Sequence, residues 1–260
     1  MSGLVWIVVP ARYGSQRFPG KPLARLQGRP MIAWVLEACS RSRRADRVVV
    51  ATDDRRIAEA VTAAGGRVEM TASTHASGTE RLAEVARRHP EVEWFVNVQG
   101  DEPGIDPGLV DRLIEQLTTA GEPDLVVSAA APIRDSESYH SPHVVKVVFD
   151  HQHRALYFSR APIPFDRDHI ADGETSLAGG RGAFQHLGIY GYSGSFLRSL
   201  TDRPAGRLAE LERLEQLNWL ESGTQIRIIE CPAAWPGIDT PEELAAFAAA
   251  WPGPGGDESE

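Results

Sequence analysis

Three cationic side chains share one short loop that contains glycines near the start of the chain. Arg12, Arg17 and Lys21 lie within ten residues of one another, with Gly14 and Gly20 between them. Guanidinium and ammonium groups hold phosphate oxygens, and glycine lets backbone N–H groups approach an anion closely. These residue types favour a polyphosphate ligand. The alternative is a solvated Gly/Pro turn, in which a few basic residues are common.

The spacing within this loop does not fit the two commonest phosphate-binding motifs. The distance from Gly14 to Gly20 is one residue longer than in a Walker A loop, and Pro22 stands where a hydroxyl residue would meet magnesium. No GxGxxG follows, so a dinucleotide fingerprint is also absent. A nucleotidyltransferase loop fits the sequence better than either motif.

Two aspartates are candidates for holding a divalent cation opposite the basic loop. Asp101 follows an apolar run in WFVNVQGDEP, and Asp239 lies in GIDTPEEL. Magnesium takes one or two carboxylates together with substrate phosphates. Each aspartate also has a plain structural interpretation, since Asp101 precedes Pro103 in a turn and Asp239 can cap or precede a helix that starts near Pro241.

Alternating strand and helix patterns are expected to bring these residues together. Residues 4–9 form an apolar run without alternation, which is typical of a strand buried on both faces of a parallel sheet. Further strands are predicted in RVVVATDD, WFVNVQGDEP and DLVVSAA, with helix patterns between them, one of which starts at the capping-box spacing of Ser77 and Glu80. This rhythm predicts an α/β fold with a doubly wound, mostly parallel sheet. Ligands of such sheets bind at the carboxyl ends of the strands.

The second half of the chain is less regular. VVKVVFD and ALYFSR are predicted to pair as strands, and HLGIYGY is a third strand. Residues 167–183, rich in Gly and Asp, are predicted to form a mobile loop.

A helix is predicted over residues 207–220. Leu208, Leu211, Glu215 and Asn218 then share one face, so the two polar side chains must find partners or contact a ligand. The alternative is a helix rotated so that both lie at the solvent boundary.

Composition excludes several classes of function. The 260 residues are 42% hydrophobic and 24% charged, with a net charge of −9, which argues against a general nucleic-acid or anionic-membrane surface. No apolar run approaches the roughly 20 residues of a membrane helix, and no secretory signal is evident. Cys39 and Cys231 are the only cysteines, which favours a reducing compartment. We therefore expect a cytoplasmic protein.

Taken together, the motifs resemble a known family. VVPARYGSQRFPGKPL, ATDD, SGTERLAE, NVQGDEP, VVKVVFD, ALYFSRAPIPFDRD, HLGIYGY, LERLEQLNWLESG and GIDTPEEL occur in the family's order over about residues 4–245. The chain resembles the CMP-KDO synthetases, or 3-deoxy-manno-octulosonate cytidylyltransferases. The resemblance implies one nucleotidyltransferase (Rossmann-like) domain over residues 1–250 with a smaller β-rich lobe at about 132–200, and a homodimer. The last ten residues, 251–260, are predicted to be disordered from their composition.

The resemblance also implies a reaction and a set of roles. CTP and an acidic acceptor, KDO, would give a CMP conjugate and pyrophosphate with Mg²⁺ as cofactor. Lys21, Arg12 and Asp101 would be catalytic. By family motif, the nucleotide would contact Arg12, Ser15, Arg17, Lys21, Ser77 and Gly78, and the metal would be held by Asp101 and Asp239. The predicted acceptor-binding residues are Arg81, Gln99, His186, Tyr190, Glu215, Gln216 and Asn218.

Departures from the family pattern gather among the acceptor motifs. The family usually has PLE at residues 207–209, a basic residue at Asn218, often a basic residue at Gln185, often Asn at His143, and smaller residues at positions 235–236. These changes predict weakened KDO binding and leave open a smaller acid, such as a phosphonate of the phosphonoformate type. The sequence also leaves open a catalytically silent nucleotide-binding protein and a glycosyltransferase, although intact Asp101, Asp239, Lys21 and Arg12 argue against a silent copy.

Overall fold

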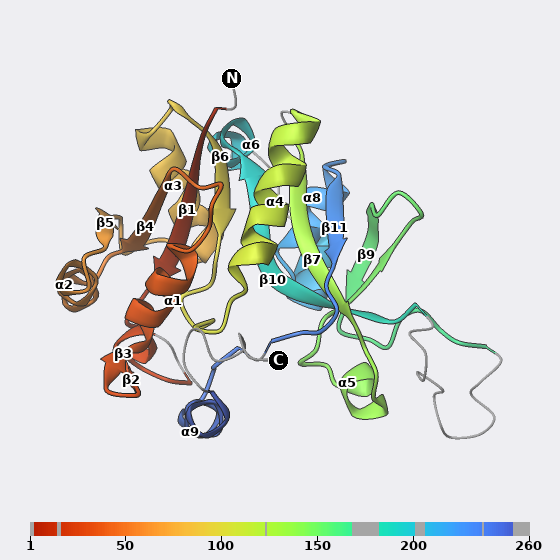
Figure 1. The fold of residues 1–260 in the computed structure, drawn as a ribbon. Helices are drawn as coiled ribbons and strands as arrows, with labels where there is room; N and C mark the ends of the chain where they lie inside the picture. Colours follow the sequence, from red (N-terminus) through yellow and green to blue (C-terminus); the bar gives the residue numbers. More distant parts are fainter. Residues whose placement is uncertain are drawn as a thin grey trace.

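A computed structural model describes residues 3–14, 17–122, 124–167, 182–200, 206–235 and 237–251. Within these ranges one nine-stranded sheet forms the centre of the molecule (Figure 1). Its strands are β1 (Leu4–Ala11), β4 (Arg47–Thr52), β5 (Arg67–Met70), β6 (Val92–Asn97), β7 (Val126–Pro132), β8 (Lys146–Phe149), β9 (Ala155–Ser159), β10 (Phe184–Ser193) and β11 (Ile226–Glu230).

The sheet is mostly parallel, as the apolar runs predict. Its main path runs β11-β7-β10-β6-β1-β4-β5, and β1 pairs in parallel with both β4 and β6. Only β10 on this path is antiparallel to its neighbours, β6 and β7. The carboxyl ends of β1, β4 and β6 therefore meet at one edge, where the chain enters the basic loop and the Asp101 turn.

Helices cover both faces of the sheet (Figure 1). Helices α1 (Met31–Cys39), α2 (Arg55–Ala63) and α4 (Pro107–Ala120) bury their apolar stripes in one core cluster. Helices α3 (Gly78–Arg88), α6 (Gly194–Ser199) and α8 (Gln216–Glu221) pack on the opposite face, with Tyr192, Phe196 and Trp219 in mutual ring contact. The two layers confirm the predicted doubly wound α/β class.

Strands β8 and β9 form an antiparallel hairpin, which confirms the predicted pairing of VVKVVFD with ALYFSR. The hairpin joins the main sheet where β8 pairs with the start of β10. A short helix, α5 (Ser136–His140), precedes it. Of the predicted mobile loop at 167–183, residues 168–181 lie outside the described ranges.

The single helix predicted over residues 207–220 is wrong. The chain forms two short helices, α7 (Arg207–Glu212) and α8, separated by Arg213 in the left-handed conformation with φ of 55°. Leu211 is 70% exposed, whereas Glu215 is half-buried and accepts hydrogen bonds from Ser77 and Thr79, so these two residues do not share a face. Tertiary contacts of Glu212 explain the break, because its carboxylate accepts from Ser159 Oγ at 2.6 Å and Arg160 N at 2.9 Å.

The last described helix, α9 (Pro241–Ala250), begins at a capping box and lies beside the short hairpin of β2 (Arg25–Leu26) and β3 (Arg29–Pro30) (Figure 1). Of the tail predicted to be disordered, only Trp251 is described, and its ring packs on Trp34. Among the described residues, none of the helices is both long and apolar enough to cross a membrane.

Candidate active site

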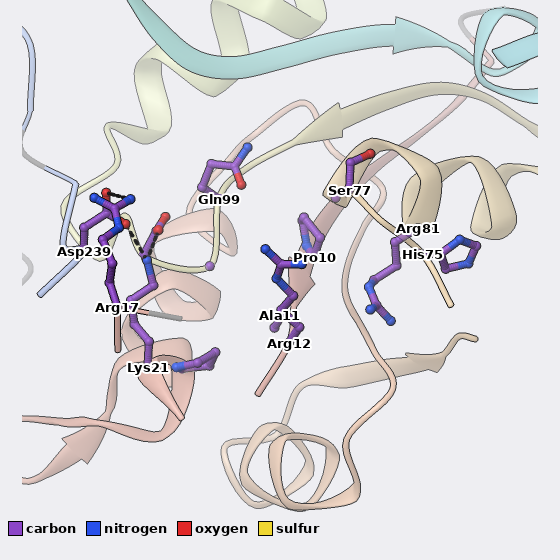
Figure 2. Close-up of a pocket in the computed structure, with 14 residues that line it drawn as sticks. Pro10, Ala11, Arg12, Arg17, Lys21, His75, Ser77, Arg81, Gln99 and Asp239 are labelled. Atoms are coloured by element: carbon purple, nitrogen blue, oxygen red, sulfur yellow. Dashed lines mark hydrogen bonds and ion pairs between the residues drawn. The ribbon is translucent and has the colours of Figure 1, made fainter. Parts of the chain in front are cut away.

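A cavity of about 500 Å³ opens at the carboxyl ends of β1 and β6. The end of β1 contributes Pro10 and Ala11, and the turn after β6 contributes Gln99, Gly100 and Asp101. Figure 2 shows Arg17, Lys21 and Asp239 on one side of it, and Ser77, Arg81 and His75 on the other. Arg12 also lines the cavity, with an exposed side chain.

Lys21 forms a bridge between the two predicted metal ligands. Its ammonium group donates to Asp101 Oδ2 and, at 3.0 Å, to Asp239 Oδ1. Arg17 contacts the other oxygen of Asp239 at 2.8 Å. The Lys21 side chain is only 12% exposed. Burial lowers the pKa of Lys21, but the charges and hydrogen bonds of Asp101 and Asp239 outweigh it, so the pKa lies above its ordinary value.

The basic loop is shaped by an aromatic contact that the sequence interpretation missed. Gly20 adopts φ of 73°, and its N–H donates to Tyr13 O at 2.9 Å just before Lys21 starts a 3-10 turn. A Cβ on Gly20 would lie 2.9 Å from the Tyr13 ring, so only glycine fits here. The Arg56 guanidinium stacks on the same ring at 3.4 Å. Tyr13 therefore fixes the path that delivers Lys21 to the cavity.

Backbone contacts place Asp239 next to Asp101. The N–H of Ile238 donates to Asp101 O at 3.1 Å. The carboxylate of Glu243 accepts from the N–H groups of Asp239 at 2.6 Å and Thr240 at 2.9 Å, and Thr240 Oγ1 accepts in return from Glu243 N. Glu243 was overlooked in the sequence, although T-x-x-E is the capping-box pattern.

The donor set at this point suits a hard divalent cation. Two carboxylates face the same spot, and the Lys21 ammonium lies between them as a cation would. No cluster of three metal-binding side chains occurs in the part of the chain that the structure describes. A metal ion held by Asp101 and Asp239 would therefore take its other ligands from water and substrate phosphates.

Ser77 begins α3 at the opposite side of the cavity. Its Oγ accepts from Glu80 N at 3.2 Å, as the predicted capping pattern requires, while the Glu80 carboxylate accepts from Ala76 N. Ser77 Oγ also donates to Glu215 at 3.1 Å, and Thr79 Oγ1 donates to the other oxygen of that carboxylate at 2.9 Å. Burial raises the pKa of Glu215, against these two hydrogen bonds, which lower it.

Arg81 lies beside Ser77, one turn into α3. It is 3% exposed and forms an ion pair with Asp53 at 3.2 Å. It also donates to Thr71 Oγ1. Asp53 follows β4, and the sequence interpretation gave it no role. A buried guanidinium held this rigidly keeps a positive charge at the Ser77 side of the cavity.

Of the other predicted acceptor residues, Gln99 lines the cavity, whereas Gln216 and Asn218 do not. Gln99 donates to Gly188 O at 3.1 Å, at the irregularity in β10. Gln216 is buried at the start of α8, and Asn218 Oδ1 accepts from Gly206 N at 2.6 Å. Trp235 packs against the core. Ser15 lies outside the described residues, and the acceptor roles stay predictions.

His186 and Tyr190 lie on β10, on either side of Gly188, which accepts the hydrogen bond from Gln99. His186 Nε2 is 2.9 Å from Ser128 Oγ, and Ser128 Oγ donates onward to Ile189 O at 2.8 Å, so the imidazole N–H is the donor to Ser128. Burial lowers the pKa of His186 to about 3. Burial, followed by the charge of Glu215, raises the pKa of Tyr190. Both side chains are therefore neutral at pH 7.

The low pKa of His186 predicts a loss of stability in acid. Between about pH 6.5 and pH 3 the unfolded chain binds a proton on this imidazole and the folded chain does not, so stability falls as pH falls through this window. At pH 4.5 the loss relative to pH 7 should be about 2.5 kcal/mol. His186→Gln retains an N–H donor for Ser128 and should remove that part of the pH dependence in urea unfolding. His151→Gln, at an exposed turn, is the control. If the free energy of unfolding of His186→Gln falls as steeply with falling pH as that of the wild type, the low pKa of His186 is refuted.

Comparison with known proteins agrees with this geometry. The family model for cytidylyltransferases matches residues 6–226. The chain is 46% identical to a 3-deoxy-manno-octulosonate cytidylyltransferase of Syntrophotalea carbinolica, over 93% of this chain and 96% of that protein. A second protein of that name, from Syntrophobacter fumaroxidans, is 47% identical over 92% of this chain and 93% of its own.

A solved structure shares the fold closely. It is a CMP:2-keto-3-deoxy-manno-octonic acid synthetase complexed with CTP, and it is 40% identical to this chain with a TM-score of 0.86. The match covers 95% of this chain and 98% of the other. These findings confirm the resemblance drawn from the motifs and the assignment as a nucleotidyltransferase enzyme. The chain belongs to the cytidylyltransferase family.

Proposed function

We propose that this enzyme transfers CMP from CTP to 3-deoxy-manno-octulosonate (KDO) and releases pyrophosphate. The observation that carries the proposal is the cavity in which Lys21 bridges Asp101 and Asp239. It lies in a fold that closely matches a synthetase solved with CTP. Several relatives named 3-deoxy-manno-octulosonate cytidylyltransferase are 43–47% identical to this chain over more than nine-tenths of its length.

The two sides of the cavity would bind different parts of the nucleotide. Arg12, Arg17 and Lys21 would hold the triphosphate, with Ser15 from the same loop, because cations there can contact several phosphate oxygens. Ser77 and Gly78 would contact the cytosine. A Cβ on Gly78 would lie 3.0 Å from the Pro10 ring, so glycine lets the start of α3 pack closely against the end of β1 on this side of the cavity.

Asp101 and Asp239 would hold Mg²⁺ once Lys21 and Arg17 turn to the triphosphate. When bound, the metal neutralises developing phosphate charge and lowers the pKa of the attacking hydroxyl. Lys21 would stabilise the pyrophosphate as it leaves, and Arg12 would hold the chain of phosphates in line with the acceptor. No protein nucleophile is required, because the acceptor hydroxyl attacks the α-phosphorus directly.

The acceptor would bind between Gln99 and the start of α8. Gln99 lines the cavity next to Asp101, and its amide is held by Gly188 O. Glu215 joins this region to the Ser77 loop through two hydroxyl groups. We assign Arg81, which lines the cavity, and His186, Tyr190, Gln216 and Asn218 around it supporting roles in acceptor binding. Neither Asn218 nor Trp235 lines the cavity, so their departure from the family pattern does not favour a smaller acid.

We further propose that residues 1–250 act as one domain with a smaller lobe at about 132–200, and that the enzyme works as a homodimer in the cytoplasm. The continuous sheet from β5 to β11, with the β8–β9 hairpin at its side, supports one domain. Two buried free cysteines suit a reducing compartment. The homodimer rests on the family alone.

Phosphorus NMR tests the proposed reaction directly. With CTP, Mg²⁺ and KDO, the expected result is loss of the three CTP signals with equal growth of pyrophosphate and one new phosphodiester. Mass spectrometry should identify the phosphodiester as the CMP conjugate, and UTP should react much more slowly. Binding of CTP without turnover on any acid would instead support a silent nucleotide-binding protein and overturn the proposal.

A further inference from the structure

Helix α9 follows one of the two proposed metal ligands, Asp239, and buries little of its own surface. Asp239 lies two residues ahead of it, and none of its ten residues is buried. An amphipathic helix is normally held by the apolar face that it buries. The position of Asp239 must therefore depend on a small number of contacts at the two ends of α9.

At its carboxyl end α9 is held by three aromatic side chains, which we call the aromatic clasp: Trp34, Phe247 and Trp251. The rings of Trp34 and Trp251 meet edge to face with centroids 5.0 Å apart, and those of Phe247 and Trp251 are 5.3 Å apart. Gln27 Nε2 also donates to Trp251 O at 3.0 Å. Aromatic contacts of this geometry stabilise beyond the area that they bury.

The clasp is anchored on rigid parts of the fold. Trp34 belongs to α1 and is 9% exposed, and its indole N–H donates to Leu26 O at 2.8 Å. The Arg29 guanidinium covers its ring at 4.0 Å. On the other side Phe247 rests on Gly104, where an added Cβ would meet the ring at 3.3 Å. Gly104 lies three residues after Asp101, so the clasp braces α9 against the loop of the other metal carboxylate.

We propose that the aromatic clasp positions Asp239 for metal binding, with Trp251 as its terminal positioning residue. The proposal rests on the function proposed above. Helix α9 spans about 15 Å, so a small tilt at Trp251 displaces its amino end relative to Asp101. At the amino end, Asp239 N donates to Glu243 and Ile238 N donates to Asp101 O, and these two hydrogen bonds are not sufficient by themselves to prevent such a tilt. Triphosphate and cytosine contacts lie on the β1 loop and α3, so they do not depend on the clasp.

The test compares CTP binding with and without metal by calorimetry. For the wild type, the dissociation constant of Mg-CTP should be smaller than that of CTP in EDTA. The ratio of the constant in EDTA to the constant with Mg²⁺ then measures how much the metal contributes to binding. Trp251→Ala should reduce this ratio roughly tenfold, as other changes behind metal ligands do, and leave CTP binding in EDTA unchanged. Phe247→Ala should act in the same direction, and Trp251→Phe should restore most of the ratio.

A double-mutant cycle separates positioning from general loosening. In the Asp239→Asn background, Trp251→Ala should have no further effect on the ratio, because the carboxylate that it positions is gone. Leu156→Ala, at a 62% exposed site on β9, is the matched control and should leave both constants unchanged. Thermal melting checks that each variant is folded.

Two results would overturn the inference. One is an unchanged ratio in folded Trp251→Ala, and the other is an equal loss of CTP affinity with and without metal. A different result would contradict the proposed function: wild-type protein would release no pyrophosphate with KDO, whatever the ratio of the two constants.

Discussion

Asp101→Asn should lower the rate of CMP transfer by about 10³-fold, which corresponds to ~4 kcal/mol of lost transition-state stabilisation. The change keeps the shape of the side chain and removes the charge that faces Lys21 and the metal position. Lys21 would then pair with Asp239 alone, at a contact of 3.0 Å. Steady-state release of pyrophosphate measures the effect, with the substrates and Mg²⁺ at saturating concentrations.

The outcome at Asp101 also separates an enzyme from a silent binding protein. CTP affinity in EDTA should change little, because the triphosphate cations and the Ser77 side of the cavity remain. Glu115→Gln is a matched control, since this carboxylate is 53% exposed and pairs with Arg44 away from the cavity. Turnover in Asp101→Asn within threefold of the wild type would show that the bridge between Lys21 and the two carboxylates is not the reaction centre.

Lys146→Met should lower the free energy of unfolding by about 3 kcal/mol. Lys146 is fully buried, and its ammonium group donates to Ser141 O at 2.8 Å, Val144 O at 2.6 Å and Arg160 O at 2.7 Å. Burial, followed by the charge of Arg160, lowers its pKa. Methionine fills similar volume and leaves three buried carbonyl groups without this donor, although it also removes the cost of burying a cation.

Urea unfolding would measure this loss, with the same dependence of the unfolding free energy on urea concentration in the variant and the wild type. Arg154→Met, in the turn of the same hairpin, is the control and should change stability little, because Arg154 is 44% exposed and its ion pair with Asp150 lies at the surface. Equal stability of Lys146→Met and wild type would show that the three carbonyl groups find other partners. In that case Lys146 does not hold the turn before β8 to the end of β9.

The site was predictable where one local rule decided the position of a residue. An apolar run without alternation identified β1, and the rule that ligands bind at the carboxyl ends of strands placed the basic loop opposite Asp101. Asp239 was already a candidate from its place in GIDTPEEL, and the family motifs paired it with Asp101, to which no local pattern ties it. The structure brings Lys21, Asp101 and Asp239 into direct contact.

Elsewhere the local pattern was overridden by tertiary contacts. Residues 207–220 have good helical periodicity, yet the contacts of Glu212 with Ser159 and Arg160 require a break at Arg213. The contacts of Trp251 with Trp34 join residues more than two hundred positions apart, and a Pro/Gly-rich end gives no sign of them. Asp53 was missed for the same reason, since its pairing with Arg81 depends on how β4 and α3 pack.

The most direct test of the central claim is pyrophosphate release with CTP and Mg²⁺, measured in parallel for KDO and phosphonoformate. We predict efficient release with KDO and none above background with phosphonoformate. Release with phosphonoformate alone would contradict the claim. That result would mean that the residues around Gln99, Glu215 and Asn218 accept a smaller acid on an otherwise intact CTP and metal site.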